Sequence, residues 1–304
     1  MINDKELERL QKTIEERWSF DRIRSMTTDA IIKKLHSFNI PFDATTFLED
    51  IKHYDSAETL AEDWYEKYDW TAPGLDKDFI WMAAIVLWER LAPDEINMEM
   101  INDLMQEGYE LLETGETIEA CDTWLRTWDY IKQKLTDEMT TAAQFDEIFR
   151  GHQCVFNWCQ DFETELGNAS LEDGEYYQRL IQYCQEFYTQ FTREEELLQG
   201  NFRRAEADAF FALGDAAMGE KKYRELTKNY PNFPWGYTGW AAQYWLLPNV
   251  PKDYDKAEAI YLRALANPNL QDREYVVDYL IDLYEEKGDP KKAEQYRKKG
   301  SRTQ

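Results

Sequence analysis

Apolar residues recur along most of the chain at intervals of three and four positions, the spacing that gathers them on one face of an α-helix. Residues 3–17 show this pattern on a charged background. No segment alternates β-branched and polar residues between turn signals, and glycine (13) and proline (9) are scarce among 304 residues. The clearest apolar stripe consists of Trp81, Ala84, Ile85, Trp88 and Leu91. The pattern therefore predicts an all-helical chain.

Capping signals divide the N-terminal part into separate helices. Asp55 is followed three positions later by Glu58, which resembles a capping box. Pro93 is expected to end the helix that carries the apolar stripe, and Asp94 is placed to cap its successor. Residues 71–76 contain Pro-Gly and predict a break. These signals predict helices over 28–36, 43–54 and 55–68.

Beyond residue 93 the sequence becomes periodic, with a frame of about 34 residues. The clearest unit covers 200–233, a second begins at Pro234 with extra residues around 248–254, and a third follows it. An earlier unit fits 101–134. Small residues are needed where two helices cross closely, and aromatic rings fill the space between successive helix pairs. In the clearest unit these positions hold Phe210, Gly214, Gly219, Tyr223, Leu226 and Pro231.

On these positions the chain resembles the tetratricopeptide-repeat superfamily over 200–300 and 101–134. Residues 78–93 also resemble uncharacterised bacterial repeat proteins that often end in a zinc-binding SEC-C tail. The sequence ends in Lys-Lys-Gly-Ser-Arg-Thr-Gln without cysteine, so we expect that tail to be absent. The resemblance implies an all-α fold, an α-solenoid of antiparallel helix pairs. We expect an N-terminal helical cap or subdomain over 1–93, degenerate helical repeats over 94–199 and tetratricopeptide-like repeats over 200–304.

The resemblance also implies a concave surface lined by the first helix of each unit. The family's clamp for a C-terminal carboxylate is matched only by Arg204, whereas Asp208, Gly239 and Tyr279 depart from it. A groove of aromatic and acidic side chains favours an apolar, basic peptide or helix as partner. Trp235 and Trp245 are equally consistent with packing between repeats, and the sequence leaves both possibilities open. The candidate groove residues are Arg204, Asp208, Phe211, Trp235, Thr238, Trp245, Tyr275, Asp278 and Asp282.

The formal charge of −25 is unevenly distributed and disfavours binding to nucleic acid or anionic lipid. From Glu89 to Asp122 there are eleven acidic residues and one basic residue. Such a surface suggests an alternative function, an acidic inhibitor or antitoxin-like protein that masks a basic partner. Residues 291–302 carry six basic residues and one acidic residue, so a head-to-tail homodimer is a further hypothesis.

The sequence contains no recognisable catalytic motif. It has neither a Gly-x-Ser-x-Gly elbow nor a phosphate-binding glycine loop, and it has three histidines. His152, Cys154 and Cys159 do not have zinc-ligand spacing and would point to different sides of a helix. We therefore expect no metal, no cofactor and no enzyme, with a hydrolase as the remote alternative. The expected function is a scaffold or adaptor that binds a protein or peptide segment.

The N-terminus lacks the basic and apolar regions of a signal peptide, and the longest apolar run, 79–88, is too short to cross a bilayer. We therefore expect a cytoplasmic protein that does not enter membranes. The four cysteines are then expected to be reduced.

Overall fold

A computed structural model describes residues 17–247 and 251–300, and all regular elements in these residues are helices. The prediction of an all-helical chain is confirmed for this part, and the helix expected over 3–17 lies outside it except for its last residue. Packing divides the chain into two compact units. Unit 1 comprises Met1–Glu110, Thr123–Lys134 and Phe149–Gln153, and unit 2 comprises Leu111–Asp122, Leu135–Ile148 and Cys154–Gln304.

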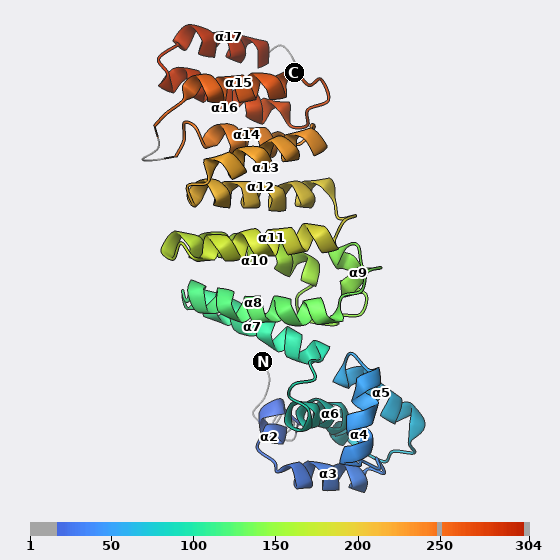
Figure 1. Cartoon of the computed structure of the whole chain (residues 1–304). Coiled ribbons are helices and arrows are strands. Elements are labelled where there is room, and N and C mark those ends of the chain that lie inside the picture. The colour runs from blue at the N-terminus through green and yellow to red at the C-terminus, as the bar shows by residue number, and fades with distance from the viewer. Residues whose placement is uncertain (1–16, 248–250, 301–304) are drawn as a thin grey trace, which may run out of the picture. The chain divides into compact units, whose positions relative to one another are not determined.

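Unit 1 is built around α6, Asp78–Leu91, which carries the predicted apolar stripe. Helices α2, α3 and α5 pack against it (Figure 1). Within α6, residues 83–88 are all buried, because neighbouring helices cover it on several sides. The other elements are α2 Phe20–Arg24, α3 Thr28–Ser37, α4 Ala44–Asp50, η1 Ile51–His53, α5 Ala57–Lys67 and η2 Gly74–Lys77.

Two predicted helix starts in unit 1 are wrong. Ser56, not Asp55, caps α5, and its Oγ accepts a hydrogen bond from the Thr59 amide at 3.2 Å. The acidic partner comes from another helix, since Glu99 accepts hydrogen bonds from the Ala57 and Glu58 amides, each at 3.0 Å. A distant carboxylate thus replaces the local capping box.

The second correction concerns Asp94. Helix α7, Met98–Glu113, begins further along, where Asn97 Oδ1 accepts a hydrogen bond from the Met100 amide at 2.8 Å. The buried Asn97 satisfies a free amide of the first turn, which is the usual role of an N-cap residue. The predicted start at Asp43 is confirmed by its hydrogen bond with the Thr46 amide.

In unit 2 each helix from α10 onward packs against the next one in the sequence (Figure 1). Helices two apart also pack together in the pairs α10 with α12, α12 with α14, and α14 with α16. The elements after α7 are α8 Thr117–Lys134, α9 Ala142–Asp146, α10 Val155–Glu172, α11 Tyr176–Gln190, α12 Glu196–Ala212, α13 Ala216–Asn229, α14 Pro234–Ala242, α15 Tyr254–Leu265, α16 Arg273–Glu286 and α17 Pro290–Gly300.

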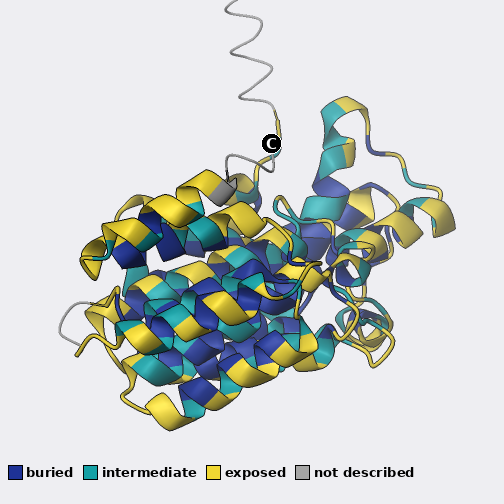
Figure 2. Ribbon diagram, turned by 90° about the horizontal axis from the view of Figure 1, so that it is seen from above, coloured by how far each residue is buried: buried dark blue, intermediate teal, exposed yellow. Residues whose placement is uncertain are grey.

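Of the two glycines predicted at close helix crossings in the clearest unit, Gly219 lies at one, whereas a Cβ added to Gly214 would meet nothing within 4 Å. A Cβ added to Gly219 of α13 would lie 2.4 Å from Cδ2 of Phe211 on α12, so only glycine fits there. Aromatic residues fill the space between successive helices, and Tyr223, Tyr261 and Tyr284 are almost completely buried. Figure 2 shows the resulting division of helices into buried and exposed sides.

Three glycines at corresponding positions of the predicted units end their helices in the same way. Gly115, Gly214 and Gly288 have φ of 83°, 82° and 79°, a left-handed conformation that glycine adopts without steric cost. In each turn the next residue donates a backbone hydrogen bond five residues back, as in a Schellman motif. These bonds join Glu116 to Leu111, Asp215 to Phe210, and Asp289 to Tyr284.

Candidate protein-binding face

Side chains from α10, α12, α14 and α16 form one surface of unit 2, which we call the even-helix face. On each helix the contributing residues are spaced mainly three or four apart, so they lie on the same side of that helix. Contacts between neighbouring helices then join these sides. The even-helix face consists of Glu163, Arg204, Asp208, Phe211, Trp235, Gly239, Gln243, Tyr275, Asp278 and Asp282.

Asp208 joins α12 to α14. Its Oδ1 accepts a hydrogen bond from Nε2 of Gln243 at 2.7 Å and a second one from the hydroxyl of Tyr223. Gly239 leaves room beside this group, because a Cβ at that position would lie 3.1 Å from Cδ of Arg204 and 2.7 Å from the Tyr223 hydroxyl oxygen. Two predicted site residues, Arg204 and Asp208, are thereby held together next to α14.

Trp235 joins α14 to α16. Its ring packs against that of Tyr275 with a centroid distance of 5.0 Å and an angle of 40° between the planes. Tyr275 remains 46% exposed, whereas Trp235 is half-buried. Aromatic pairs in this arrangement offer ring surface to a partner while one side of each ring is already packed.

Carboxylates close to Arg204 are unusually easy to protonate. The pKa of Glu163 is raised to about 7, mainly by burial and to a smaller extent by nearby Asp208, while Arg204 opposes the shift. Burial also raises the pKa of Asp208 to about 6, against the hydrogen bond from Tyr223 and the charge of Arg204. The two acids share one basic residue in a poorly hydrated environment, which disfavours their charged forms.

Two predicted groove residues are not placed to contact a partner. Trp245 is 3% exposed, and its Nε1 donates a hydrogen bond to the hydroxyl of Tyr261 at 3.0 Å, so it belongs to the core. The physical reason is that α14 ends at Ala242, and Trp245 follows in a turn that packs onto α15. Thr238 is 4% exposed on the buried side of α14.

The remaining predicted residues are at least partly accessible. Phe211 is half-buried and meets the ring of Tyr244 edge-on at 5.9 Å. Asp278 and Asp282 are exposed, one and two turns beyond Tyr275 on α16. Arg204, Asp208, Trp235 and Tyr275 take part in the contacts described above, which makes them the core of the even-helix face.

Glu163 and Gln243 were missed by sequence reasoning. The sequence did contain a signal for Gln243. In the run Trp240–Leu247 every other residue is apolar or aromatic, and a polar side chain in such a run needs a hydrogen-bond partner when it is buried. Glu163 had none. Glu163 belongs to the helix pair α10 and α11, which does not follow the 34-residue frame. The frame therefore could not predict which surface Glu163 lies on.

Two cysteines of unit 2 are core residues, and His152 of unit 1 lies at the surface. Cys159 and Cys184 are fully buried, and burial raises the pKa of both thiols. The exposed His152 lies with Nδ1 3.1 Å from Oδ1 of Asn102. Within residues 17–247 and 251–300, no three His, Cys, Asp or Glu side chains are grouped so that they could hold a metal ion.

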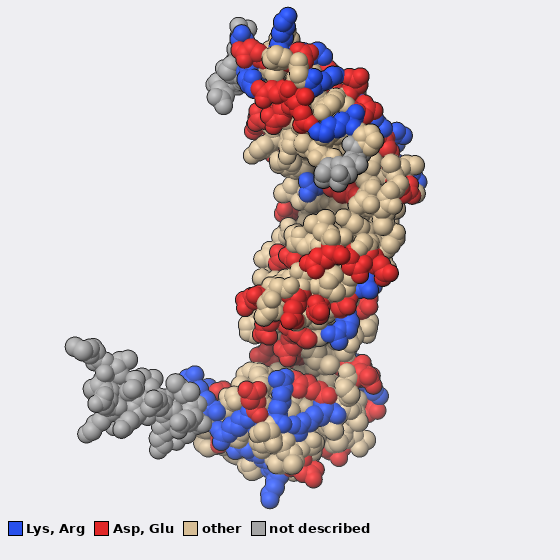
Figure 3. Space-filling view, turned by 90° about the vertical axis from the view of Figure 1, so that its left-hand side faces the viewer, with Lys and Arg blue, Asp and Glu red and all other residues tan. Residues whose placement is uncertain are grey.

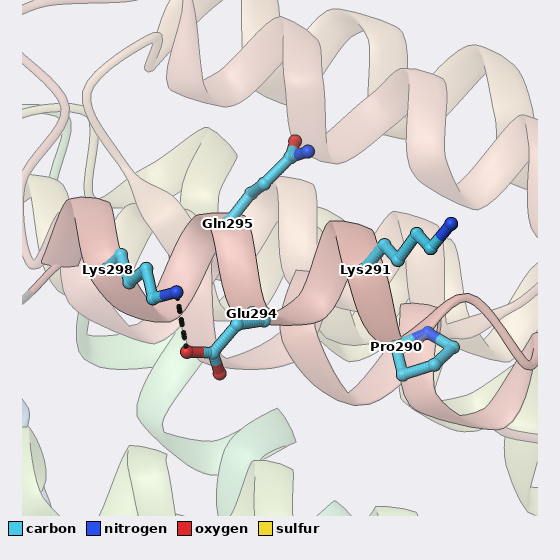
Figure 4. Close-up of a pocket in the computed structure, with 5 residues that line it drawn as sticks. All are labelled: Pro290, Lys291, Glu294, Gln295 and Lys298. Atoms are coloured by element: carbon cyan, nitrogen blue, oxygen red, sulfur yellow. Dashed lines mark ion pairs between the residues drawn. The ribbon is translucent and has the colours of Figure 1, made fainter.

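A shallow depression runs along α17 (Figure 4). Its lining comes from that single helix, and it includes an ion pair between Lys298 Nζ and Glu294 Oε1 at 3.3 Å. Side chains from different elements do not converge there, so the depression offers no chemistry that the exposed side of any charged helix lacks.

Acidic side chains are prominent in both units on the side drawn in Figure 3. None of the described helices combines the length and hydrophobicity needed to cross a bilayer. No protein-family model matches the chain, and no curated protein or solved structure matches it either. The resemblance to tetratricopeptide repeats therefore stays a prediction.

Proposed function

We propose that the chain is a scaffold or adaptor that binds a segment of another protein on the even-helix face. The proposal includes the architecture, an α-solenoid of antiparallel helix pairs in which α10, α12, α14 and α16 are the first helices. The packing order of unit 2 supports it, because even-numbered helices contact each other as well as their neighbours in sequence. In a stack of hairpins, the helices that approach each other this way lie on the inner side of any curvature.

One observation carries the functional part of the proposal. Asp208 on α12 contacts Gln243 at the C-terminal end of α14, and Trp235 in the first turn of α14 contacts Tyr275 on α16, so these contacts tie residues from three successive hairpins together. A segment lying across α12, α14 and α16 would therefore meet acidic and aromatic side chains in turn. Exposed aromatic residues are the side chains that most often dominate binding energy at protein interfaces.

The test is capture of partners from a native lysate by the tagged full-length chain, compared with the double variant Trp235→Ala/Tyr275→Ala. We expect the variant to fold, because Trp235 is half-buried and Tyr275 is exposed, and to lose the captured partner. Tyr177→Ala on α11 is the control, since Tyr177 is another partly buried tyrosine outside the even-helix face. Capture that survives in the folded double variant would refute the proposal.

Salt dependence separates this function from the alternative of an acidic masking protein. Binding through aromatic contacts weakens modestly between low and moderate salt, whereas binding through a diffuse acidic surface weakens steeply. Capture that is lost in moderate salt and is unaffected by Trp235→Ala/Tyr275→Ala would favour the masking protein.

A further inference from the structure

Lysines of the odd-numbered helices pair with acids away from the even-helix face. Lys222 Nζ lies 2.6 Å from Glu206 Oε1, Lys256 Nζ lies 2.6 Å from Glu220 Oε1, and Lys292 Nζ lies 2.8 Å from Glu258 Oε1. These lysines belong to α13, α15 and α17. Much of the basic charge of unit 2 is thus already used in ion pairs on those helices.

The acids of the even-helix face are in a different situation. Among the described residues, neither Asp278 nor Asp282 forms an ion pair, and the carboxylate of Glu163 accepts no hydrogen bond. Asp208 has hydrogen-bond donors from Tyr223 and Gln243, but Arg204 is the basic residue that acts on both Asp208 and Glu163. Glu163 and Asp208 therefore share one guanidinium group, that of Arg204, whereas Asp282 lies near the guanidinium of Arg297, which already pairs with Glu285.

This imbalance decides the sign of charge that a bound segment must carry. A carboxylate on the partner would be attracted by Arg204 but repelled by the acids around it. A basic side chain would be attracted by Glu163 and Asp208, and its charge would offset the burial that disfavours their ionised forms. The exposed ring of Tyr275 beside Trp235 adds an aromatic surface on which a cation or an apolar side chain can pack.

We propose that the even-helix face selects a protein segment that places an arginine or lysine side chain against Glu163 and Asp208 and an apolar side chain on Trp235 and Tyr275. This inference rests on the proposed function and deepens it by naming the chemistry of the partner. A second basic side chain on the segment meets Asp278 and Asp282 on α16. The face thus takes a basic, amphipathic segment and rejects an acidic one.

The binding reaction is coupled to protonation. Glu163 faces Arg204 and Asp208 from α12, with Tyr183 and Cys184 of α11 close by, and Asp208 faces Tyr223 and Gln243. A cation binds the deprotonated carboxylates, whose pKa values of about 7 and about 6 place part of the population in the protonated form at neutral pH. The affinity should therefore rise from pH 5.5 to pH 8, with protons released on binding.

The experiment is selection of twelve-residue peptides from a random display library on the full-length chain, followed by titration calorimetry with the selected synthetic peptides. We expect a consensus with at least one Arg or Lys near an apolar residue. Glu163→Gln/Asp208→Asn should weaken these peptides about tenfold or more, and it should abolish most of the proton release. The control Glu175→Gln/Glu225→Gln removes the same charge from two exposed positions, one directly before α11 and one on α13, and should leave affinity unchanged.

The other outcomes distinguish failure of the inference from failure of the proposed function. A peptide consensus without basic residues overturns the basic-partner inference and leaves the binding face in place. The same holds if the affinity is unchanged in Glu163→Gln/Asp208→Asn but lost in Trp235→Ala/Tyr275→Ala. Failure to select any peptide that depends on Trp235 or Tyr275 overturns both. Another outcome is that sedimentation shows self-association of the chain and that Glu163→Gln/Asp208→Asn abolishes the self-association. In that case the occupant is the basic C-terminal segment of a second copy, and the choice of an external partner is overturned.

Discussion

The indole ring of Trp124 occupies the space that a side chain on Gly108 would need. A Cβ added to Gly108 would lie 1.9 Å from Nε1 of Trp124, and that nitrogen donates a hydrogen bond to the carbonyl of Met105 at 3.1 Å. Trp124 is completely buried, so it has little room to move aside. The close approach of α7 and α8 in unit 1 therefore depends on a glycine at this position.

Gly108→Ala should destabilise the fold by about 1–3 kcal/mol, because the added methyl group overpacks the core against Trp124. The matched control is Gly167→Ala in α10, where nothing lies within 4 Å of the added Cβ. That substitution should stabilise by about 0.5–1 kcal/mol through the better helix propensity of alanine. Urea unfolding followed by circular dichroism measures both, and equal effects of the two variants would contradict the packing of Trp124.

Trp245→Ala should cost about 3–5 kcal/mol, since it empties a large volume in the core and leaves the Tyr261 hydroxyl without its donor. Trp235→Ala should cost about 1–2 kcal/mol, because Trp235 is only half-buried. The same urea titration compares them. Similar losses for the two tryptophans would show that the placement of Trp245 in the core and Trp235 on the surface is incorrect.

Lys222→Met should destabilise by about 3 kcal/mol, because it leaves the carboxylate of Glu206 buried without its ion-pair partner. The Glu206 side chain is 2% exposed, and Gln185 and Tyr188 also donate hydrogen bonds to it. The double variant Glu206→Gln/Lys222→Met should recover most of the loss. Arg150→Met, which removes an exposed pair with Glu62, is the control and should cost less than about 1 kcal/mol. A double variant no more stable than Lys222→Met would rule out the pairing.

Glu163→Gln should be more stable than the unchanged chain at pH 8 and equally stable near pH 4. The folded pKa of about 7 is raised above the unfolded value of 4.5, so the folded state keeps its proton while the unfolded state loses it. Stability then falls as pH rises between these two values and levels off above about 7. The gain at pH 8 should reach at most about 3 kcal/mol.

Urea unfolding at several pH values checks this dependence. Glu172→Gln, at the exposed end of the same helix, is the control and should change stability little at any pH. A stability difference between Glu163→Gln and the unchanged chain that does not vary with pH would show that Glu163 is not buried beside Asp208.

The repeat pattern by itself determined the features that depend on residues close together in the chain. It gave Gly115, Gly214 and Gly288 equivalent positions in the 34-residue frame, and the structure finds each of them in a left-handed turn at the end of a helix. Gly108 and Trp124 both fall in the predicted unit 101–134, a single helical hairpin, but their contact is a finding of the structure. Helical periodicity is a local property, so the sequence contains it fully.

Tertiary structure alone decided the features that depend on residues far apart in the chain. Glu99 replaces the expected capping partner of α5 because α7 brings it there, and Trp245 is buried because the chain after α14 folds onto α15. Glu163 joins Arg204 and Asp208 through the packing of α10 on α12, where the irregular repeat spacing hides the relation. The charge and accessibility of the even-helix face depend on residues from several helices that are far apart in the sequence. They therefore cannot be predicted from any short segment of the chain.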